Sequence, residues 1–337
     1  MSAAARDERY LGHVHNFRGF AIVLIIVTHC VSAFDWSASP VLVDVLKRGV
    51  ANGTILFLFI AGYLFQHLSG RYQVGDYLWK KARFVVLPYL LVSIPALLLY
   101  TVFMQRPDVP AGFYERPAIE QIGFFLVTGS HLAPFWFIPT IVLYYLASPL
   151  LYWLDRQSWF YWLLPLLVAI PVFVPRGHLD PVQSFVHFLP VWVLGMACSH
   201  HRELASRWLE RLLLPLCVLV AVLFALEIGL AKGTHSAFSS LGKIALTLVL
   251  FELFRRGGRL FDRGFALAGT LSFGLFFLHS YVISASKILV ERIAGGQPPG
   301  NLFAFACASL FAVLASMLVV RLVQMILGKA SRLVIGV

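Results

Sequence analysis

The sequence has unusually little charge for its length. Only 13% of its 337 residues are Asp, Glu, Lys or Arg, whereas 59% are hydrophobic, and the mean hydropathy is +0.81. Soluble domains carry about 25% charged residues, so this composition excludes a soluble globular protein. The chain must therefore use lipid as its solvent.

The sequence patterns of several common enzyme sites are also missing. The chain has no HExxH, GxSxG or CxxC motif, so we expect neither a metal site nor a serine-hydrolase elbow. Its four cysteines fall in separate apolar segments, and we expect small core side chains rather than disulfides at Cys30, Cys198, Cys217 and Cys307.

The net charge of +11 is spread between apolar runs rather than gathered in a basic tail or patch. This distribution is typical of topology signals and of contacts with anionic lipid headgroups, and it argues against nucleic acid as a partner. Ten apolar runs are long enough to cross a bilayer as helices. The sequence therefore predicts an all-α polytopic membrane protein, a bundle of about ten transmembrane helices, near residues 16–34, 50–67, 84–103, 135–154, 159–174, 184–199, 212–231, 237–254, 266–286 and 302–327.

An even number of helices places both termini on the same side of the membrane. If that side is the cytoplasm, it carries most of the 27 lysines and arginines, Arg6 and Arg9 included, as the positive-inside rule requires. The longest predicted loop, about residues 104–134, is only a polar excursion. We therefore expect residues 1–337 to form a single membrane domain without an appended soluble domain.

The first predicted helix carries Arg18 and, eleven residues later, His29. Eleven residues are about three helical turns, so both side chains share one helix face, roughly 16 Å apart along the axis. We expect Arg18 at the headgroup level and His29 near the middle of the bilayer, where an ionisable side chain is costly and by default marks a functional site. A neutral imidazole can accept the proton of an attacking hydroxyl. The alternatives are a topology anchor for Arg18 and a purely structural hydrogen bond for His29.

A second histidine, His279, is predicted to lie about as deep in the ninth helix as His29 lies in the first. Two histidines at similar depth can flank one cavity, so His279 is a second candidate for the catalytic site. A structural hydrogen bond to a neighbouring helix explains it equally well.

Lys80, Lys81 and Arg83 precede the third predicted helix on the cytoplasmic side. Basic residues there usually only fix the topology, but together with Arg18 they are candidates for binding the phosphates of a cytoplasmic cofactor. Trp136 opens the fourth predicted helix at the outer boundary. It belongs either to an interfacial aromatic belt or to a binding site in which it stacks on a sugar ring.

Five further ionisable residues interrupt the predicted helices. We expect Glu227 to orient a histidine or balance a cation, and Lys243 and Arg321 to extend their long side chains to the interface. The full set is His187, Glu227, Lys243, Glu252 and Arg321.

Five motifs, in the same order along nearly the whole chain, resemble those of the acyltransferase 3 family of integral membrane acyltransferases. The family's R-G-x-A segment followed by histidine corresponds to Arg18–Ala21 with His29, and its F-x-x-S-G-Y/F-L element to residues 57–64. Its basic stretch before proline corresponds to Lys80–Arg83 with Pro88–Tyr89. Its W-F-[IL] element with a later S/F-P-L corresponds to Trp136–Ile138 with Ser148–Leu150, and its S-x-G-x-F/Y-x-x-H element to Ser272–His279.

The resemblance implies an acyl-CoA-dependent O-acetyltransferase of a bacterial inner membrane that modifies a hydroxyl of a cell-surface or lipid-linked glycan. Acetyl-CoA would enter from the cytoplasm as the co-substrate, and the glycan would be handled at the outer side. Two departures from the family pattern stand out. Ala61 replaces the usual serine, and the basic stretch contains one arginine, Arg83, where the family often has several.

Two other classes of protein share these features. A secondary transporter or flippase for a glycan or small molecule also has about ten helices and buried histidines, although the paired inverted repeats of many transporters are not visible in this sequence. A membrane scaffold gives no reason for Arg18 and His29 to share a face. Direct transfer, an acyl-histidine relay and any oligomeric state are all compatible with the sequence.

Overall fold

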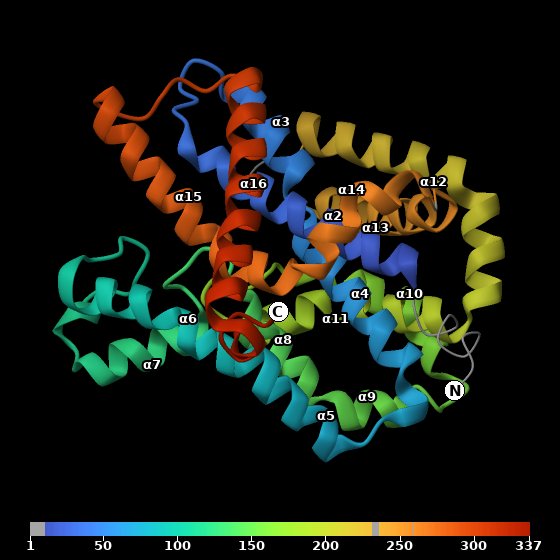
Figure 1. Cartoon of the computed structure of the whole chain (residues 1–337). Coiled ribbons are helices and arrows are strands. Elements are labelled where there is room, and N and C mark those ends of the chain that lie inside the picture. Colours follow the sequence, from blue (N-terminus) through green and yellow to red (C-terminus); the bar gives the residue numbers. More distant parts are fainter. Residues whose placement is uncertain (1–10, 231–235, 258) are drawn as a thin grey trace.

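The computed structural model describes residues 11–230, 236–257 and 259–337, the last segment with side chains from residue 264 on. The chain is 82% helical (Figure 1). Within the described residues there is no β-strand, and Asp35 and Pro299 form an isolated bridge. The predicted all-α polytopic class is confirmed.

The helices of seven or more residues are, in chain order, α2 (Gly12–Cys30), α3 (Pro40–Val50), α4 (Gly53–His67), α5 (Val74–Lys81), α6 (Leu87–Leu98), α7 (Ala118–Thr128), α8 (Phe137–Leu146), α9 (Ser148–Leu154), α10 (Leu164–Phe173), α11 (Pro181–His200), α12 (Arg202–Leu230), α13 (Ala237–Gly257), α14 (Arg259–Thr270), α15 (Ser272–Ala294) and α16 (Leu302–Leu327). A π-helical segment, Ala82–Val86, joins α5 to α6, and the short helix α17 (Ser331–Val334) follows α16.

Eight helical segments of the described chain are long and apolar enough to cross a membrane, and a ninth is the pair α8 and α9. This pair, which corresponds to the predicted span 135–154, is bent by 55°. The break lies at Ala147, and Pro149 follows in the first turn of α9. Proline has no N–H to donate and its ring clashes with the carbonyl one turn earlier, which disfavours a continuous helix there. The predicted span 159–174 is the shorter apolar helix Phe160–Phe173.

The predicted span 266–286 is divided in two. Its first residues belong to α14, and the membrane-spanning candidate is Ser272–Ala294. The division has a packing reason, because α14 lies along the first turns of α2 instead of continuing into α15. Arg6 and Arg9, which enter the predicted orientation, lie outside the described residues, and the orientation itself stays a prediction.

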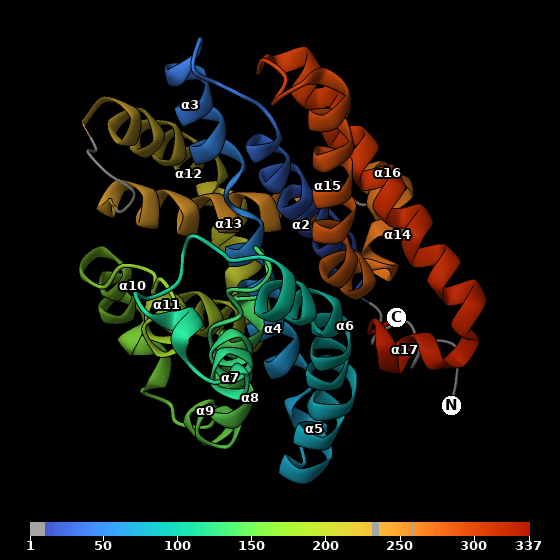
Figure 2. The same cartoon turned by 90° about the vertical axis from the view of Figure 1, so that its left-hand side faces the viewer.

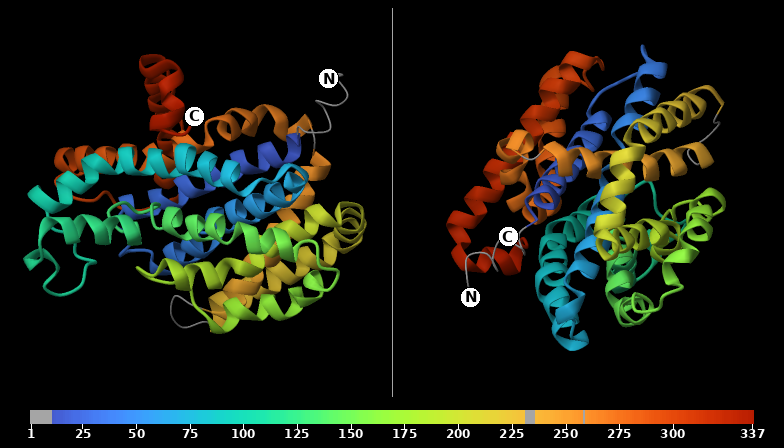
Figure 3. Two further views of the ribbon diagram at one scale, coloured as in Figure 1. Left: turned by 90° about the horizontal axis from the view of Figure 1, so that it is seen from below. Right: turned by 90° about the vertical axis from the view of Figure 1, so that its right-hand side faces the viewer.

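Helix α2 occupies the centre of the bundle. It packs against α4 and α13 on one side and against α14, α15 and α16 on the other (Figures 1 and 2). The C-terminal helices and the hairpin of α12 with α13 therefore lie on opposite sides of α2, as the right-hand view in Figure 3 shows. One central helix thus contacts most of the elements that surround a site on its surface.

Glycines in the motifs permit the closest helix contacts. A β-carbon at Gly19 would overlap the carbonyl oxygen of Phe265 on α14, and a β-carbon at Gly62 on α4 would overlap that of Trp192 on α11. Small residues let helix backbones approach in this way inside membranes. The glycines of the R-G and S/A-G motifs therefore have a packing role.

The expectation that all four cysteines lie in the core was wrong for two of them. Cys30 and Cys198 are buried, whereas Cys217 and Cys307 are exposed on α12 and α16. A membrane helix is apolar on all sides, so hydrophobicity does not show which face is covered.

Replacement of Gly62 by alanine is expected to lower the unfolding free energy by about 1–3 kcal/mol, because the new methyl group overlaps a backbone oxygen of α11. Thermal unfolding of the purified protein in detergent measures the effect. Gly123→Ala on α7, where a β-carbon meets no atom within 4 Å, is the matched control. Equal melting temperatures for both variants would contradict the packing role.

Candidate functional site

The structure brings His29 and His279 together. His29 lies in the last turn of α2 and His279 in the second turn of α15, and their ring centroids are 5.4 Å apart. His279 is completely buried, whereas His29 is partly exposed. The two histidines that the sequence placed at similar depth therefore form one pair, which we call the histidine pair.

The hydrogen bonds of His279 define the role of each ring nitrogen. Nδ1 lies 2.7 Å from the carbonyl oxygen of Leu275, which can only accept, so Nδ1 donates and carries the proton of the neutral ring. Nε2 is buried and has no hydrogen-bond partner. Because Nδ1 faces back to its own helix, the lone pair of Nε2 points away from α15.

His29 lies further along its helix than the sequence suggested. The spanning segment runs from Gly12 to Ala33, so His29 is roughly 26 Å from its start and roughly 6 Å from its end. The expected position near the middle of the bilayer was counted from Arg18 at the headgroup level, roughly 16 Å before His29, and not from the start of the helix. Backbone hydrogen bonds of Asp35 with Pro298 and Gly300 tie the chain just beyond α2 to the chain before α16.

Aromatic side chains form one wall beside the histidine pair. Phe276 precedes His279 by three residues on α15, and their ring centroids are 6.4 Å apart. Phe276 also packs on Phe135 and Phe137. Trp136 itself points elsewhere. Its ring packs on Phe188 and on the guanidinium of Arg176, which is 4.5 Å from the ring centroid.

Arg18 faces α14 at the other end of α2. Its Nη2 donates to the carbonyl oxygen of Gly269 at 2.8 Å and lies 3.4 Å from Nδ1 of His15. A cation is favourable near the C-terminal end of a helix such as α14, so Arg18 stabilises this packing. It also shares the face of α2 that carries His29, as the spacing predicted.

The other three basic candidates have separate surroundings. Lys80 forms an exposed ion pair with Asp76, with 2.8 Å between Nζ and Oδ2. Lys81 is largely covered and its ammonium lies over the rings of Tyr77 and Tyr145, 5.1 Å and 4.7 Å from their centroids. Arg83 is exposed and packs on Phe84. Lys80 and Arg83 are thus the more accessible of the three.

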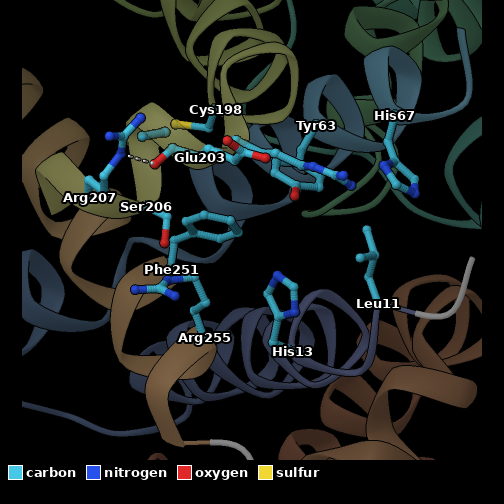
Figure 4. Close-up of a pocket in the computed structure, with 12 residues that line it drawn as sticks. Leu11, His13, Tyr63, His67, Cys198, Glu203, Ser206, Arg207, Phe251 and Arg255 are labelled. Atoms are coloured by element: carbon cyan, nitrogen blue, oxygen red, sulfur yellow. Dashed lines mark hydrogen bonds between the residues drawn. The ribbon is translucent and has the colours of Figure 1, made fainter. Parts of the chain in front are cut away.

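A pocket of about 510 Å³ opens between the ends of five helices (Figure 4). These ends, of α2, α4, α11, α12 and α13, all belong to the side predicted to be cytoplasmic. The pocket is lined by Leu11, His13, Tyr63, His67, Cys198, Arg202, Glu203, Ala205, Ser206, Arg207, Phe251 and Arg255. Three arginines and two histidines give the pocket a basic character. The sequence analysis had interpreted such basic residues only as topology signals.

The pocket lies on a different side of α2 from Arg18 and His29. His13 precedes Arg18 by five residues, which turns it about 140° away around the helix. Phe251 packs on Phe59 and on Tyr63 at centroid distances of 5.1 Å and 5.3 Å. These rings fill the space between the pocket and the centre of the bundle.

Charged residues near the helix ends opposite the pocket form a second group that the sequence analysis did not assemble. Arg48 on α3 pairs with Glu227 on α12, with 3.0 Å between Nη1 and Oε1, and with Asp44, with 2.8 Å between Nε and Oδ2. Glu227 therefore balances a cation, as predicted. Lys243 on α13 lies within electrostatic reach of Glu227, Arg176 and Arg48. Glu227 and Lys243 inside apolar runs were the available sequence signals.

The remaining predicted ionisable residues have structural partners. Glu252 is fully buried and accepts hydrogen bonds from Arg255 and Arg256, each at 2.7 Å. His187 Nδ1 donates to the carbonyl oxygen of Val174 at 2.7 Å, and Arg321 is exposed beside Gln324. Within the described part of the chain, no group of three or more His, Cys, Asp and Glu side chains is arranged to hold a metal ion.

The fold and the histidine pair define a polytopic membrane protein with two neighbouring imidazoles beside its central helix. A family model described as an acyltransferase domain, that of the acyltransferase 3 family, matches residues 13–321. The chain belongs to this family and is a membrane acyltransferase. No significant match was found among curated proteins or among solved structures.

Proposed function

We propose that this membrane acyltransferase transfers an acetyl group from cytoplasmic acetyl-CoA to a hydroxyl of a cell-surface or lipid-linked glycan, in a bacterial inner membrane. The observation that carries the proposal is the histidine pair, in which His29 is partly accessible and His279 presents an unpartnered nitrogen. Family membership favours a transferase over a transporter. A glycan is the acceptor that the resemblance to polysaccharide-modifying members suggests.

In this proposal His29 is the general base. Its neutral ring takes the proton of the acceptor hydroxyl while the hydroxyl oxygen attacks the thioester carbonyl. The carbon–sulfur bond then breaks, and the proton passes from His29 to the sulfur of CoA. The bond changes balance without any further reactant, and the ring returns to its neutral form.

His279 stabilises the protonated His29. Its Nδ1–H is fixed on Leu275, so its Nε2 is the nitrogen left to accept a hydrogen bond from His29. A neutral His29 can already donate its N–H to this nitrogen, and the hydrogen bond becomes charge-assisted and stronger when His29 is an imidazolium. Such a bond stabilises the transition state more than the ground state, which is the condition for an increase in rate.

Arg18 attracts the phosphates of the donor at the cytoplasmic end of the same helix face. A guanidinium can contact phosphate through paired N–H groups. About 16 Å of helix separate it from His29, so the pantetheine arm of CoA would lie along α2. Lys80, Lys81 and Arg83 would contribute positive charge to the same entrance, and Trp136 would border the acceptor on the outer side.

Replacement of His29 by alanine is expected to lower kcat about 10²–10⁴-fold, the typical contribution of a positioned general base. Release of CoA from acetyl-CoA, together with acetyl transfer followed by mass spectrometry, measures the loss. An unchanged gel-filtration profile shows that the variant is folded. A folded variant that acetylates the glycan at the normal rate would exclude His29 as the base.

Replacement of His279 by alanine is expected to lower kcat about tenfold to a hundredfold, the range for a lost hydrogen bond to a charged group. His279→Gln keeps a side-chain acceptor, and we expect it to recover part of the rate. Comparison of kcat for the two variants at saturating donor tests this role. Equal losses in both would show that His279 acts only through packing.

Replacement of Arg18 by alanine is expected to raise KM for acetyl-CoA about tenfold through the loss of a charge-assisted contact. Arg18→Lys preserves the charge and separates this effect from the contact with Gly269. The matched control is the double variant Arg202→Ala/Arg207→Ala in the basic pocket of Figure 4. If only the double variant raises KM, the donor enters through the pocket and the role assigned to Arg18 is wrong.

A further inference from the structure

The basic pocket of Figure 4 has no role in the transfer reaction proposed above. Arg18, His29 and His279 are not among its lining residues, and the packed rings of Tyr63 and Phe251 lie between it and the centre of the bundle. Its volume of about 510 Å³ falls within the range of small-molecule sites. The pocket is therefore large enough for a ligand of its own.

The charges that line the pocket are mostly positive. Arg202, Arg207 and Arg255 contribute guanidinium groups, and Glu203 is the one carboxylate among the lining residues that the structure describes. Arg255 is bonded to the buried Glu252 through Nε and Nη2, each at 2.7 Å. Arg207 has only a backbone partner, with 3.4 Å from Nε to the carbonyl oxygen of Glu203, and Arg202 has no ion pair within the described chain. Two guanidinium groups are therefore available to an anion.

Three further polar side chains reach the pocket from α2 and α4. Tyr63 and His67 lie one turn apart near the end of α4 with stacked rings, and His13 lies in the first turn of α2. None of the three forms a hydrogen bond with another residue that the structure describes. Because Tyr63 is only 6% exposed and lines the pocket, its hydroxyl can find a partner only there.

The polar groups of the pocket are suited to a phosphate. Guanidinium, phenol and imidazole groups each supply a hydrogen-bond donor, and a guanidinium can contact phosphate through two N–H groups at once. A terminal phosphate carries up to two negative charges and three acceptor oxygens. It therefore matches two arginines that lack a carboxylate and the neighbouring donors.

The mouth of the pocket lies outside the apolar part of α12. The first ten residues of this helix, 202–211, include five charged residues, and the apolar run begins at residue 212. Arg202 and Arg207, both exposed, thus lie at the headgroup level or in the water beyond it. Basic pockets between membrane helices on the cytoplasmic side are known to take phosphate-bearing headgroups.

We propose that the pocket is a second anion-binding site, which holds a phosphate group of a ligand other than acetyl-CoA. Arg202 and Arg207 supply the opposite charge, and Tyr63, His13 and His67 donate to the phosphate oxygens. The ligand is a soluble phosphate ester or the headgroup of an anionic lipid, since both present the same group at this depth. The site goes beyond the proposed acyl transfer and does not depend on it.

Isothermal titration calorimetry with inorganic pyrophosphate tests the site without turnover. The full-length protein is placed in phosphatidylcholine nanodiscs, empty nanodiscs give the baseline, and chloride keeps the ionic strength constant. We expect pyrophosphate to bind, and saturating acetyl-CoA to leave its dissociation constant unchanged. The absence of binding at millimolar concentration, or displacement of pyrophosphate by acetyl-CoA, would overturn the proposal.

Single variants identify the residues responsible. Arg202→Gln and Arg207→Gln are each expected to weaken pyrophosphate binding about tenfold, through the loss of a charge-assisted contact. Tyr63→Phe keeps the aromatic packing and removes the hydroxyl, and we expect a loss of roughly threefold to tenfold. Arg211→Gln, at an exposed position of α12 outside the pocket, is the matched control. An equal loss in this control would mean a general effect of charge and refute the assignment.

Two further measurements separate this site from that of the donor and identify the source of the phosphate. Arg18→Ala is expected to retain pyrophosphate binding, and a loss of about tenfold would place the anion at Arg18 instead. Native mass spectrometry then detects lipid on protein released from mixed phosphatidylcholine and phosphatidylglycerol nanodiscs. Phosphatidylglycerol that the wild type retains and Arg202→Gln loses identifies a lipid headgroup, whereas equal retention identifies a soluble phosphate ester. Both results support the phosphate site and assign its source.

Discussion

The packing of α2 at the centre of the bundle is the constraint on which the other features depend. Its backbone approaches α14 at Gly19, and its far end meets α15 where the rings of His29 and His279 come within 5.4 Å. Because one helix carries both Arg18 and His29, the position of Arg18 fixes the position of His29. A displacement of α2 would therefore alter the contact of Arg18 with α14 and the histidine pair together.

The buried carboxylates Glu252 and Glu227 are paired with arginines in this protein. The fully buried Glu252 has two arginine partners, and the nearly buried Glu227 has Arg48. A buried carboxylate without a cation would be strongly destabilising, so these pairs account for ionisable residues in apolar helices. Lys243 differs, because the carboxylate within its reach is already bonded to Arg48.

Aromatic rings divide the interior into regions with different electrostatic character. Phe251, Phe59 and Tyr63 separate the basic pocket of Figure 4 from the face of α2 that carries Arg18 and His29. Phe276 and its neighbours line the opposite, outer side of the histidine pair. Neither His29 nor His279 lines the pocket, so the pocket does not extend to the histidine pair.

Most of the fold class and part of the candidate site could be predicted from the sequence. Apolar length predicted the spanning helices, and eleven residues at 100° per residue put Arg18 and His29 on one face, because both are local properties of a helix. The bend between α8 and α9 and the division between α14 and α15 were harder to place, because the first depends on a local proline and the second on packing against α2.

The sequence by itself determined that this protein is embedded in lipid, that it is helical, and how its ionisable residues are spaced along each helix. Only the tertiary structure decided that His29 meets His279, that Arg48 pairs with Glu227 across 179 positions of the chain, and that Cys217 faces outward. The reason is physical. Helices that are apolar on every side carry no pattern that selects their partners, so close contacts at glycines and pairing of buried charges make that selection.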